Sequence, residues 1–209
     1  MFLKRFVVGE LNTNCYLIAC EESKKAVVID PGGEEAVDSI LNILQKNNFD
    51  LKYIINTHGH IDHIIGNNLL KLKTEALLLI HRLDANMLVD GNKNISFFMG
   101  KEICSPHADK LLEAGDEICL GTLKLKVIHT PGHTLGGISL VLNNIVFTGD
   151  TLFAGGIGRS DLPGGSYQDL IKSIKGKLLV LGDDKIIYPG HGPDSTIGEE
   201  RRTNLYLKN

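Results

Sequence analysis

Three histidines and an aspartate lie within six positions of one another, at His58, His60, Asp62 and His63. The run before them, residues 51–55, is short, apolar and partly β-branched, which predicts a buried strand whose carboxyl end leads into the cluster. Neutral imidazole nitrogens and carboxylate oxygens are donors that zinc and iron accept. The fold must therefore hold a strand end and its loop around a metal site.

The spacing of the cluster predicts which side chains converge. Alternate residues of an extended chain point to the same side, so His58, His60 and Asp62 are expected to converge, while His63 points elsewhere. This arrangement suits two adjacent ions better than one. The opposing interpretation, a polar surface loop with chance histidines, is weakened by the motifs downstream.

Length and charge bound the kind of protein. The 209 residues fit one domain, residues 1–209, able to bury about 70% of the surface that the unfolded chain exposes. The formal net charge of -3, with mixed signs, provides no basic face for nucleic acid and no polybasic segment for an anionic membrane. Neither partner is expected, although charge alone does not exclude a nuclease. A small-molecule substrate is expected from the motifs below, and oligomeric state is not readable.

Cysteine usage and the first residues predict the compartment. The four cysteines include no Cys-x-x-Cys pair, and we interpret them as small apolar residues that stay reduced. Lys4 and Arg5 lie inside what would be the apolar part of a signal peptide, and no run reaches the length of a membrane span. We expect a cytoplasmic protein.

The first half alternates strands and helices. After an expected hairpin of strands 2–8 and 15–20, strands are predicted at 26–29, 51–55 and 76–80, and helices at 34–47, around 69–72 and at 82–88. The 34–47 segment repeats apolar residues along one face, so it should lie on a sheet. Residues 90–110 lack periodicity and contain several turn residues, which predicts a long loop or a lid beside the site.

The second half begins again with strands. They are predicted at 116–120, 123–129, 138–142 and 145–148, followed by a helix at 167–175, a strand at 185–188 and a final helix after Ser195. Two such halves predict an α/β fold built as a four-layer αββα sandwich, with two sheets face to face and helices outside. No linker and no residue-level repeat divides the chain.

Three further motifs place a histidine or an aspartate beside glycine where a predicted strand ends. They are Thr130-Pro131-Gly132-His133, Thr148-Gly149-Asp150 and Tyr188-Pro189-Gly190-His191. Glycine allows tight turns and close approach to a ligand, and binding sites gather at the carboxyl ends of strands. With the four residues of the cluster, these three bring the candidate ligands to seven. Seven ligands suffice for two ions that share a carboxylate and leave positions open for water.

The motifs carry a family resemblance. Thr-His-x-His-x-Asp-His at 57–63, Pro-Gly-His-Thr at 131–134, Thr-Gly-Asp at 148–150 and Pro-Gly-His-Gly at 189–192 are similar to the motifs of the metallo-β-lactamase superfamily, in the same order and across essentially the whole chain. Asp30-Pro31-Gly32-Gly33 and the segments 148–153 and 155–159 resemble its glyoxalase II branch, the hydroxyacylglutathione hydrolases. The αββα sandwich of that family agrees with the layers predicted above.

The resemblance implies a ligand for every motif. His58, His60 and His133 would hold a first metal ion, Asp62, His63 and His191 a second, and Asp150 would bridge the two. The implied cofactor is a pair of divalent ions, with zinc expected and iron or manganese as alternatives. Asp30 is expected either to fix a histidine or its loop, or to be an ordinary turn residue. His81, His107 and His129 lie outside the motifs and are expected to be non-ligands.

The activity implied is metal-dependent thioester hydrolysis. Two close cations lower the pKa of a bridging water from about 15.7 to near 7, and they stabilise the developing oxyanion. Asp62 is expected to be catalytic, orienting this water or accepting its proton. Arg159, in a glycine-rich loop, is the candidate for binding a substrate carboxylate, with pairing to Asp161 as the alternative.

One departure and one competing activity stay open. Full-length glyoxalase II has a C-terminal helical region that helps to bind glutathione, whereas this chain continues only some 18 residues beyond His191. The resemblance is therefore to the short, single-domain hydrolases, whose thiol carrier is not fixed. Persulfide dioxygenases share the fold and a Gly-Arg-x-Asp segment like 158–161, and use one iron that by resemblance would be held by His58, His133 and Asp150.

We favour the hydrolase because Asp150 is followed by Thr-Leu-Phe, as in the hydrolases. Lactone or phosphodiester hydrolysis is a smaller alternative. A further one is that the metals only brace the fold, which predicts closed coordination shells; seven ligands fall short of closing two shells without water.

Overall fold

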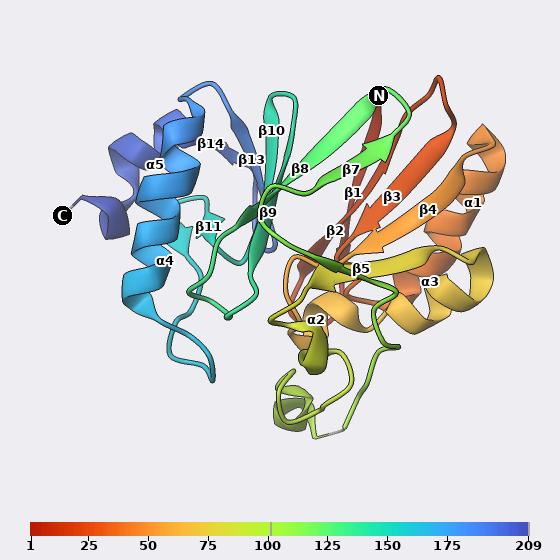
Figure 1. Cartoon of the computed structure of the whole chain (residues 1–209), viewed down its shortest axis with the longest axis horizontal. Helices are drawn as coiled ribbons and strands as arrows, with labels where there is room; N and C mark the ends of the chain where they lie inside the picture. Colours follow the sequence, from red (N-terminus) through yellow and green to blue (C-terminus); the bar gives the residue numbers. More distant parts are fainter. Residues whose placement is uncertain (101, 209) are drawn as a thin grey trace.

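The first of two large sheets is built from the amino-terminal half of the chain. The computed structural model describes residues 1–100 and 102–208, and Figure 1 shows the two sheets facing each other with helices outside. The strands of the first sheet, in spatial order, are β1 (Phe2–Val8), β2 (Thr13–Ala19), β3 (Lys25–Ile29), β4 (Asp50–Ile55), β5 (Leu77–His81) and β6 (Lys110–Leu112). β1 to β3 are antiparallel, and β3 to β6 run parallel.

The second sheet comes from the carboxyl-terminal half. Its strands are β7 (Glu117–Leu120), β8 (Leu123–His129), β9 (Ile138–Leu142), β10 (Ile145–Gly149), β13 (Ile186–Pro189) and β14 (Ser195–Thr196), in the spatial order β14-β13-β10-β9-β8-β7. β7 to β10 form an antiparallel meander, and β13 runs parallel to β10. A small hairpin of β11 (Leu152–Phe153) and β12 (Gly156–Ile157) follows β10.

Helices cover the outer faces of both sheets. α1 (Val37–Asn47), preceded by a 3-10 turn at Glu34–Ala36, and α3 (Asn67–Thr74) pack on the first sheet, whereas α4 (Tyr167–Ser173) and α5 (Ile197–Thr203) pack on the second (Figure 1). α2 (Ile61–Ile64) is a single turn at the end of the first sheet. Short 3-10 turns lie at Ala85–Met87, Ser96–Met99, Leu179–Leu181 and Leu205–Leu207, and a π-helical turn at Ile174–Leu178 continues α4.

The core follows the two-residue period of the strands. In β3, Val27 and Ile29 point between the sheets and meet residues such as Leu125 of β8, while Val28 points outward to the layer of α1 and α3. In β10, Phe147 joins the core between the sheets, and the preceding residue packs under α4 and α5. The predicted α/β class and four-layer αββα sandwich are therefore confirmed.

The structure differs from the predicted elements in short segments. The helix expected at 82–88 is wrong: only the 3-10 turn Ala85–Met87 forms, because the buried carboxylate of Asp84 bonds to two other loops and turns the chain there. β6, β11, β12 and β14 were not predicted, since two or three residues show no periodicity. The described part of 90–110 is loop and 3-10 turn before β6; residue 101 lies outside the described residues, and a lid role stays a prediction.

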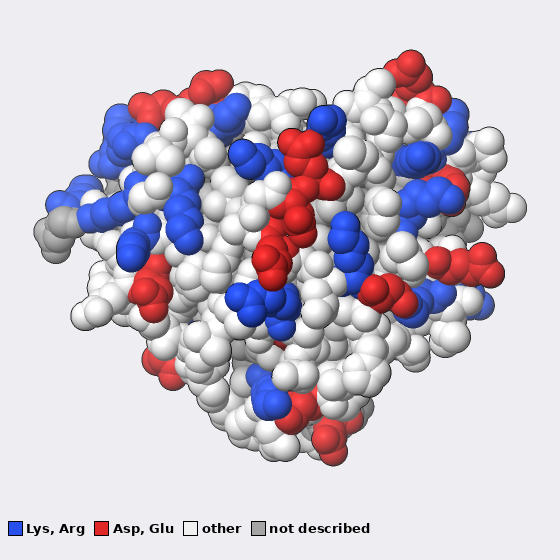
Figure 2. Space-filling model, viewed as in Figure 1, with Lys and Arg blue, Asp and Glu red and all other residues white. Residues whose placement is uncertain are grey.

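Charge is mixed over the surface. On the face shown in Figure 2, basic side chains gather over α4 and α5, but Arg201 pairs with Asp183 and Arg202 with Glu199. Acidic side chains form a band across the middle of the same face. Among the described residues, no helix is both long and apolar enough to cross a membrane.

Candidate metal centre

All seven predicted ligands lie where strands end, at one edge of the sandwich. His58 and His60 follow β4, and Asp62 and His63 lie in α2 directly after them. The other three come from the second sheet: His133 follows β8, Asp150 follows β10 and His191 follows β13. Loops from both sheets therefore meet at this edge.

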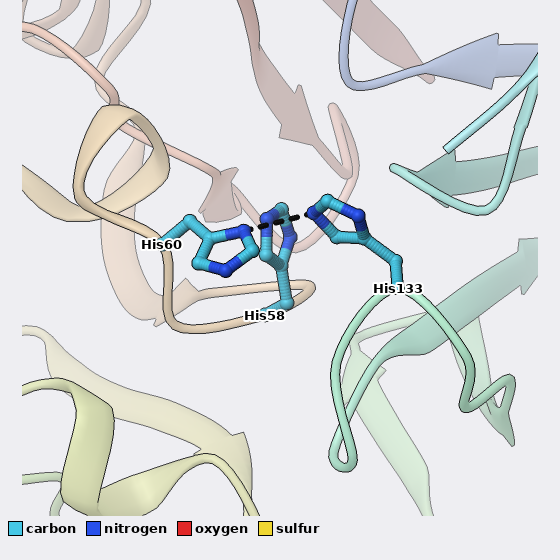
Figure 3. A group of neighbouring side chains, drawn as sticks. All are labelled: His58, His60 and His133. Atoms are coloured by element: carbon cyan, nitrogen blue, oxygen red, sulfur yellow. Dashed lines mark hydrogen bonds between the residues drawn. The ribbon is translucent and has the colours of Figure 1, made fainter. Parts of the chain in front are cut away.

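His58, His60 and His133 form a first group (Figure 3). Their rings point toward one another from two different loops, and the nearest ring nitrogens, Nδ1 of His60 and Nε2 of His133, are 2.8 Å apart. One nitrogen of each ring lies within 4.8 Å of the other two. All three residues are buried. The group has the size and the chemistry to hold one metal ion.

Asp62, His63 and His191 form a second group. Nε2 of His191 is 3.1 Å from Oδ2 of Asp62 and 3.3 Å from Nε2 of His63. The expectation that Asp62 converges with His58 while His63 points elsewhere is wrong, because the chain is helical rather than extended over Ile61–Ile64. The helical turn places consecutive residues 62 and 63 beside the loop of His191.

Asp150 lies between the two groups. Its Oδ1 is 3.4 Å from Nε2 of His63, and its Oδ2 is 3.6 Å from Nε2 of His133 and 3.5 Å from Nε2 of His191. Each carboxylate oxygen therefore faces at least one histidine of a group. The carboxylate of Asp150 is thus within 3.6 Å of histidines from both groups.

Several buried polar atoms of these groups lack a hydrogen-bond partner. Among the described residues, Nε2 of His58, Nε2 of His60 and Oδ1 of Asp150 are buried without one. Buried polar side-chain atoms in folded proteins nearly always have a partner, so these nitrogens and this oxygen require another one. A divalent cation accepts this donor set, and the residues present fit it.

Comparison with known proteins identifies the family. A sequence model of the metallo-β-lactamase superfamily matches residues 8–191, a range that contains all seven candidate ligands. The chain belongs to the metallo-β-lactamase superfamily. Its members bind metal ions, in agreement with the histidine and aspartate groups described above.

Relatives within the superfamily are named for different activities. The hydroxyacylglutathione hydrolase GloC of Haemophilus influenzae is 35% identical over 213 residues, 96% of this chain and 95% of the relative. The crystal structure of the BLEG-1 B3 metallo-β-lactamase aligns with a TM-score of 0.92 at 32% identity over 100% of both chains. ETHE1 from Myxococcus xanthus aligns with a TM-score of 0.83 at 32% identity, over 98% of this chain and 84% of that one. Membership in the superfamily therefore leaves the substrate open.

The first histidine group is electrostatically suited to metal. Burial, followed by the neighbouring histidines, lowers the pKa of His58 well below its ordinary value and that of His60 to about 3. Both rings are neutral at physiological pH as a result. Neutral imidazole is the form that binds a cation, so these ligands need not lose a proton first.

In the second group, the carboxylates and the imidazoles stabilise each other's ionised forms. Burial opposes ionisation of Asp62, but His63 and His191 outweigh it and hold its pKa well below the ordinary range. Burial also disfavours imidazolium, yet Asp62, Asp150 and Asp30 raise the pKa of His63 well above its usual value. In the absence of metal, protons on these histidines therefore balance the carboxylates.

Asp30 fixes both a loop and a histidine. Its carboxylate accepts hydrogen bonds from the backbone N–H and the hydroxyl of Thr57, each at 2.7 Å. Its Oδ2 is 3.0 Å from Nδ1 of His63. Of the two interpretations of Asp30 drawn from sequence, the structure therefore supports the positioning one.

Asp84 plays a similar part that sequence reasoning missed. Its buried carboxylate accepts hydrogen bonds from the N–H of Gly59 (3.3 Å), the hydroxyl of Thr134 (2.6 Å) and the N–H of Gly136 (2.6 Å). Gly59 stands between two candidate ligands and Thr134 follows a third. Asp84 thus ties together the two loops of the first group. Its position just beyond β5, the strand next to β4, was the available signal.

The start of β2 holds the second group. The hydroxyl of Thr13 donates to Oδ2 of Asp62 at 3.0 Å. The amide of Asn14 donates to the carbonyls of Pro189 (2.9 Å) and Gly192 (2.8 Å), on either side of His191. These contacts fix the His191 loop against the first sheet.

Arg159 contributes to the centre through its backbone. Nδ1 of His133 is 2.7 Å from the carbonyl oxygen of Arg159, so Nδ1 carries the proton and Nε2 is left for the cluster. The guanidinium group of Arg159 is exposed and donates to both carboxylate oxygens of Asp161, at 3.0 and 2.9 Å. His81 and His129 stack on each other with ring centroids 4.2 Å apart, and neither belongs to a candidate metal group.

Proposed function

We propose that this protein is a metal-dependent hydrolase that cleaves thioesters with the help of two divalent cations. The observation that carries the proposal is the pair of ligand groups with Asp150 between them, in which several buried nitrogen and oxygen atoms lack a hydrogen-bond partner. Their separate positions favour two ions over one. The substrate carbonyl and its attacking water would be held between them.

Each ion has its own residues in this proposal. The first would be held by His58, His60 and His133, the second by Asp62, His63 and His191, with Asp150 shared. Cations bound there would lower the pKa of a water ligand from about 15.7 to near 7 and so would supply hydroxide at neutral pH. Zinc is the expected metal, and imidazole and carboxylate ligands also suit iron or manganese.

The chain itself orients the reactants. Asp62 is ionised at neutral pH, and the hydroxyl of Thr13 holds its Oδ2 in place, so this carboxylate can accept a hydrogen bond or a proton from water. A thioester suits such a site, because a thiolate leaves without strong acid assistance. Arg159 would bind a substrate carboxylate, which would take the place of the Asp161 carboxylate on the guanidinium group.

Similarity to GloC supports a 2-hydroxyacyl thioester of glutathione, or of a related thiol, as the substrate. A second candidate is persulfide oxidation at a single iron held by His58, His133 and Asp150. The observation that favours it is the structure of the segment 158–161. The carbonyl oxygen of Arg159 contacts Nδ1 of His133, and the guanidinium group of Arg159 forms a bidentate ion pair with Asp161. The structural similarity to ETHE1 also supports this second candidate, so the experiment below includes it.

The test combines metal content with three assays on one preparation. We would measure zinc, iron and manganese per chain, then hydrolysis of S-lactoylglutathione, oxygen uptake with glutathione persulfide, and hydrolysis of a cephalosporin. About two equivalents of metal with thioester cleavage support the proposal. One equivalent of iron with oxygen uptake establishes the second candidate, and cleavage of the cephalosporin alone overturns both.

A further inference from the structure

A pocket of about 290 Å³ lies beside the first histidine group. Its walls come from four segments: the turn after β5, the loop that contains Lys93, the loop after His133, and the loop before α4. Leu83, Met87, Leu135 and Pro163 supply apolar surface to it. Nothing in the proposed chemistry at the metal ions uses this space.

Two contacts join the pocket to the metal centre. Met87 packs against Gly59 so tightly that a Cβ atom on the glycine would lie 2.4 Å from Cβ of Met87. Gly59 stands between His58 and His60 in the chain. Thr134, on the other wall, directly follows a ligand of the same group. The walls of the pocket are therefore in contact or continuous with the loops that carry the first histidine group.

The two charged side chains of the lining, Asp84 and Lys93, are already paired within the protein. The carboxylate of Asp84 accepts three hydrogen bonds from the neighbouring loops. The ammonium group of Lys93 is 3.3 Å from Oδ2 of Asp90. A ligand with several charged groups finds no unpaired charged side chain in this lining, whereas an apolar chain needs none.

Two of the apolar residues of the pocket are also exposed to solvent. Leu83 is 44% exposed and Leu135 is 58% exposed, although both border a concave surface. A chain that covers them removes apolar surface from water on both partners, which favours its binding. The pocket is thus shaped for an uncharged hydrocarbon group.

We propose that this pocket receives the acyl chain of the thioester, and that the enzyme prefers acyl groups larger and more apolar than lactoyl. The inference rests on the proposed thioester hydrolysis and adds the class of acyl group to it. We assign the pocket to the acyl group rather than to the thiol, because peptide or nucleotide thiol carriers are charged and the lining offers no unpaired charged side chain to bind them.

Two substrate series separate the acyl group from the thiol. In one, acetyl, butyryl and hexanoyl thioesters share N-acetylcysteamine as the thiol; in the other, acetyl thioesters are made with ethanethiol, butanethiol and hexanethiol. With the metal-loaded full chain, kcat/KM should rise about 10-fold or more from acetyl to hexanoyl in the first series. It should stay nearly flat in the second. A rise only in the second series, or in neither, overturns the proposal.

Variants that fill the pocket test its location. Leu83→Trp and Leu135→Trp should each lower the hexanoyl-to-acetyl ratio of kcat/KM about 10-fold, with metal content unchanged. The matched control is Leu111→Trp, at a leucine of β6 that is 51% exposed and does not line the pocket. An equal loss in the control, or an unchanged ratio in both pocket variants, contradicts the assignment.

A different result identifies failure of the proposed function itself. If the metal-loaded protein cleaves none of these thioesters, thioester hydrolysis is refuted, and the pocket is then tested by calorimetric titration with hexanamide. Binding that Leu83→Trp weakens and Leu111→Trp leaves intact supports an apolar-chain pocket. Absence of hexanamide binding to the unaltered protein overturns it.

Discussion

Gly190 faces the carboxylate of Asp150 so closely that a Cβ atom on the glycine would lie 2.1 Å from Oδ1. The same Cβ atom would lie 2.9 Å from Cε1 of His63. Neither neighbour is a flexible chain end, because His63 is buried and Asp150 is mostly buried within the candidate metal centre. Only glycine fits at this position without displacing Asp150 or His63.

We therefore predict that Gly190→Ala reduces activity about 100-fold, since a displacement of about 1 Å at a reacting centre has this effect. Metal content by elemental analysis should fall as well. Gly176→Ala is the control, because nothing lies within 4 Å of a Cβ atom there. Full metal content and full activity in Gly190→Ala would contradict the position given to Asp150.

Asp84→Ala should lower the affinity for the metal ion of the first group and leave the affinity for the other ion unchanged. Removing the carboxylate frees the N–H groups of Gly59 and Gly136, and so loosens the two loops of the first group. Loss of such a positioning residue typically lowers metal affinity about 10- to 100-fold. The measurement is a zinc titration in competition with a chromophoric chelator, with Asp183→Ala as a distant control. Two equivalents of unaltered affinity would show that Asp84 does not position the ligands.

The metal-free protein, prepared by chelation, should be most stable near pH 6.5. His58 and His60 have lowered pKa values, about 3 for His60, so below pH 6.5 the unfolded chain binds protons that the folded chain excludes. Stability is lost as pH falls, by about 1.4 kcal/mol per pH unit for each such group. His63 and His191 have raised pKa values, and their contribution is lost as pH rises above 6.5 through those values.

Urea denaturation of the chelated protein from about pH 5 to about pH 8 measures this dependence. His60→Gln should flatten the acid side, because it removes one of the three histidines, His58, His60 and His81, whose pKa values are lowered by burial. Stability that rises as pH falls below 6.5 would show that these rings are protonated in the folded state.

Arg159→Ala should raise KM about 10-fold for substrates that carry a carboxylate, as the loss of one charge-assisted hydrogen bond does. The value of kcat should change little, because the carbonyl that holds His133 belongs to the backbone and survives the substitution. Asp161→Ala is the informative partner variant: it frees the guanidinium group, so KM should fall or stay the same. A drop in kcat for Arg159→Ala at constant KM would refute the binding role.

Much of the fold could be predicted from sequence because its main strands and helices are long enough to show a period. β3 and β10, for example, alternate residues between two cores, and α1 carries one apolar face. β11, β12 and β14 have two residues each, too few for any pattern. The turn after β5 departs from the predicted helix because a distant contact through Asp84 decides its path.

The candidate site divides in the same way. Glycine-flanked residues at strand ends, such as His133 and Asp150, were recognisable because local sequence reports the turn. The grouping of Asp62 with His191 depends on a helical turn and on a loop from the other sheet, and spacing along an extended chain predicted it wrongly. Asp84 is an isolated aspartate in the sequence. Its role is to bond to two loops that are distant along the chain and come near it only in the folded protein.

Both sheets contribute to each candidate ion. In the first group His133 comes from the second sheet and its partners from the first, and in the second group His191 plays that part. A chain divided after β6 would therefore yield two fragments, neither of which holds a complete ligand set. Metal uptake by such a mixture would report reassociation of the fragments, and its loss on dilution would measure how strongly the ions join the two halves.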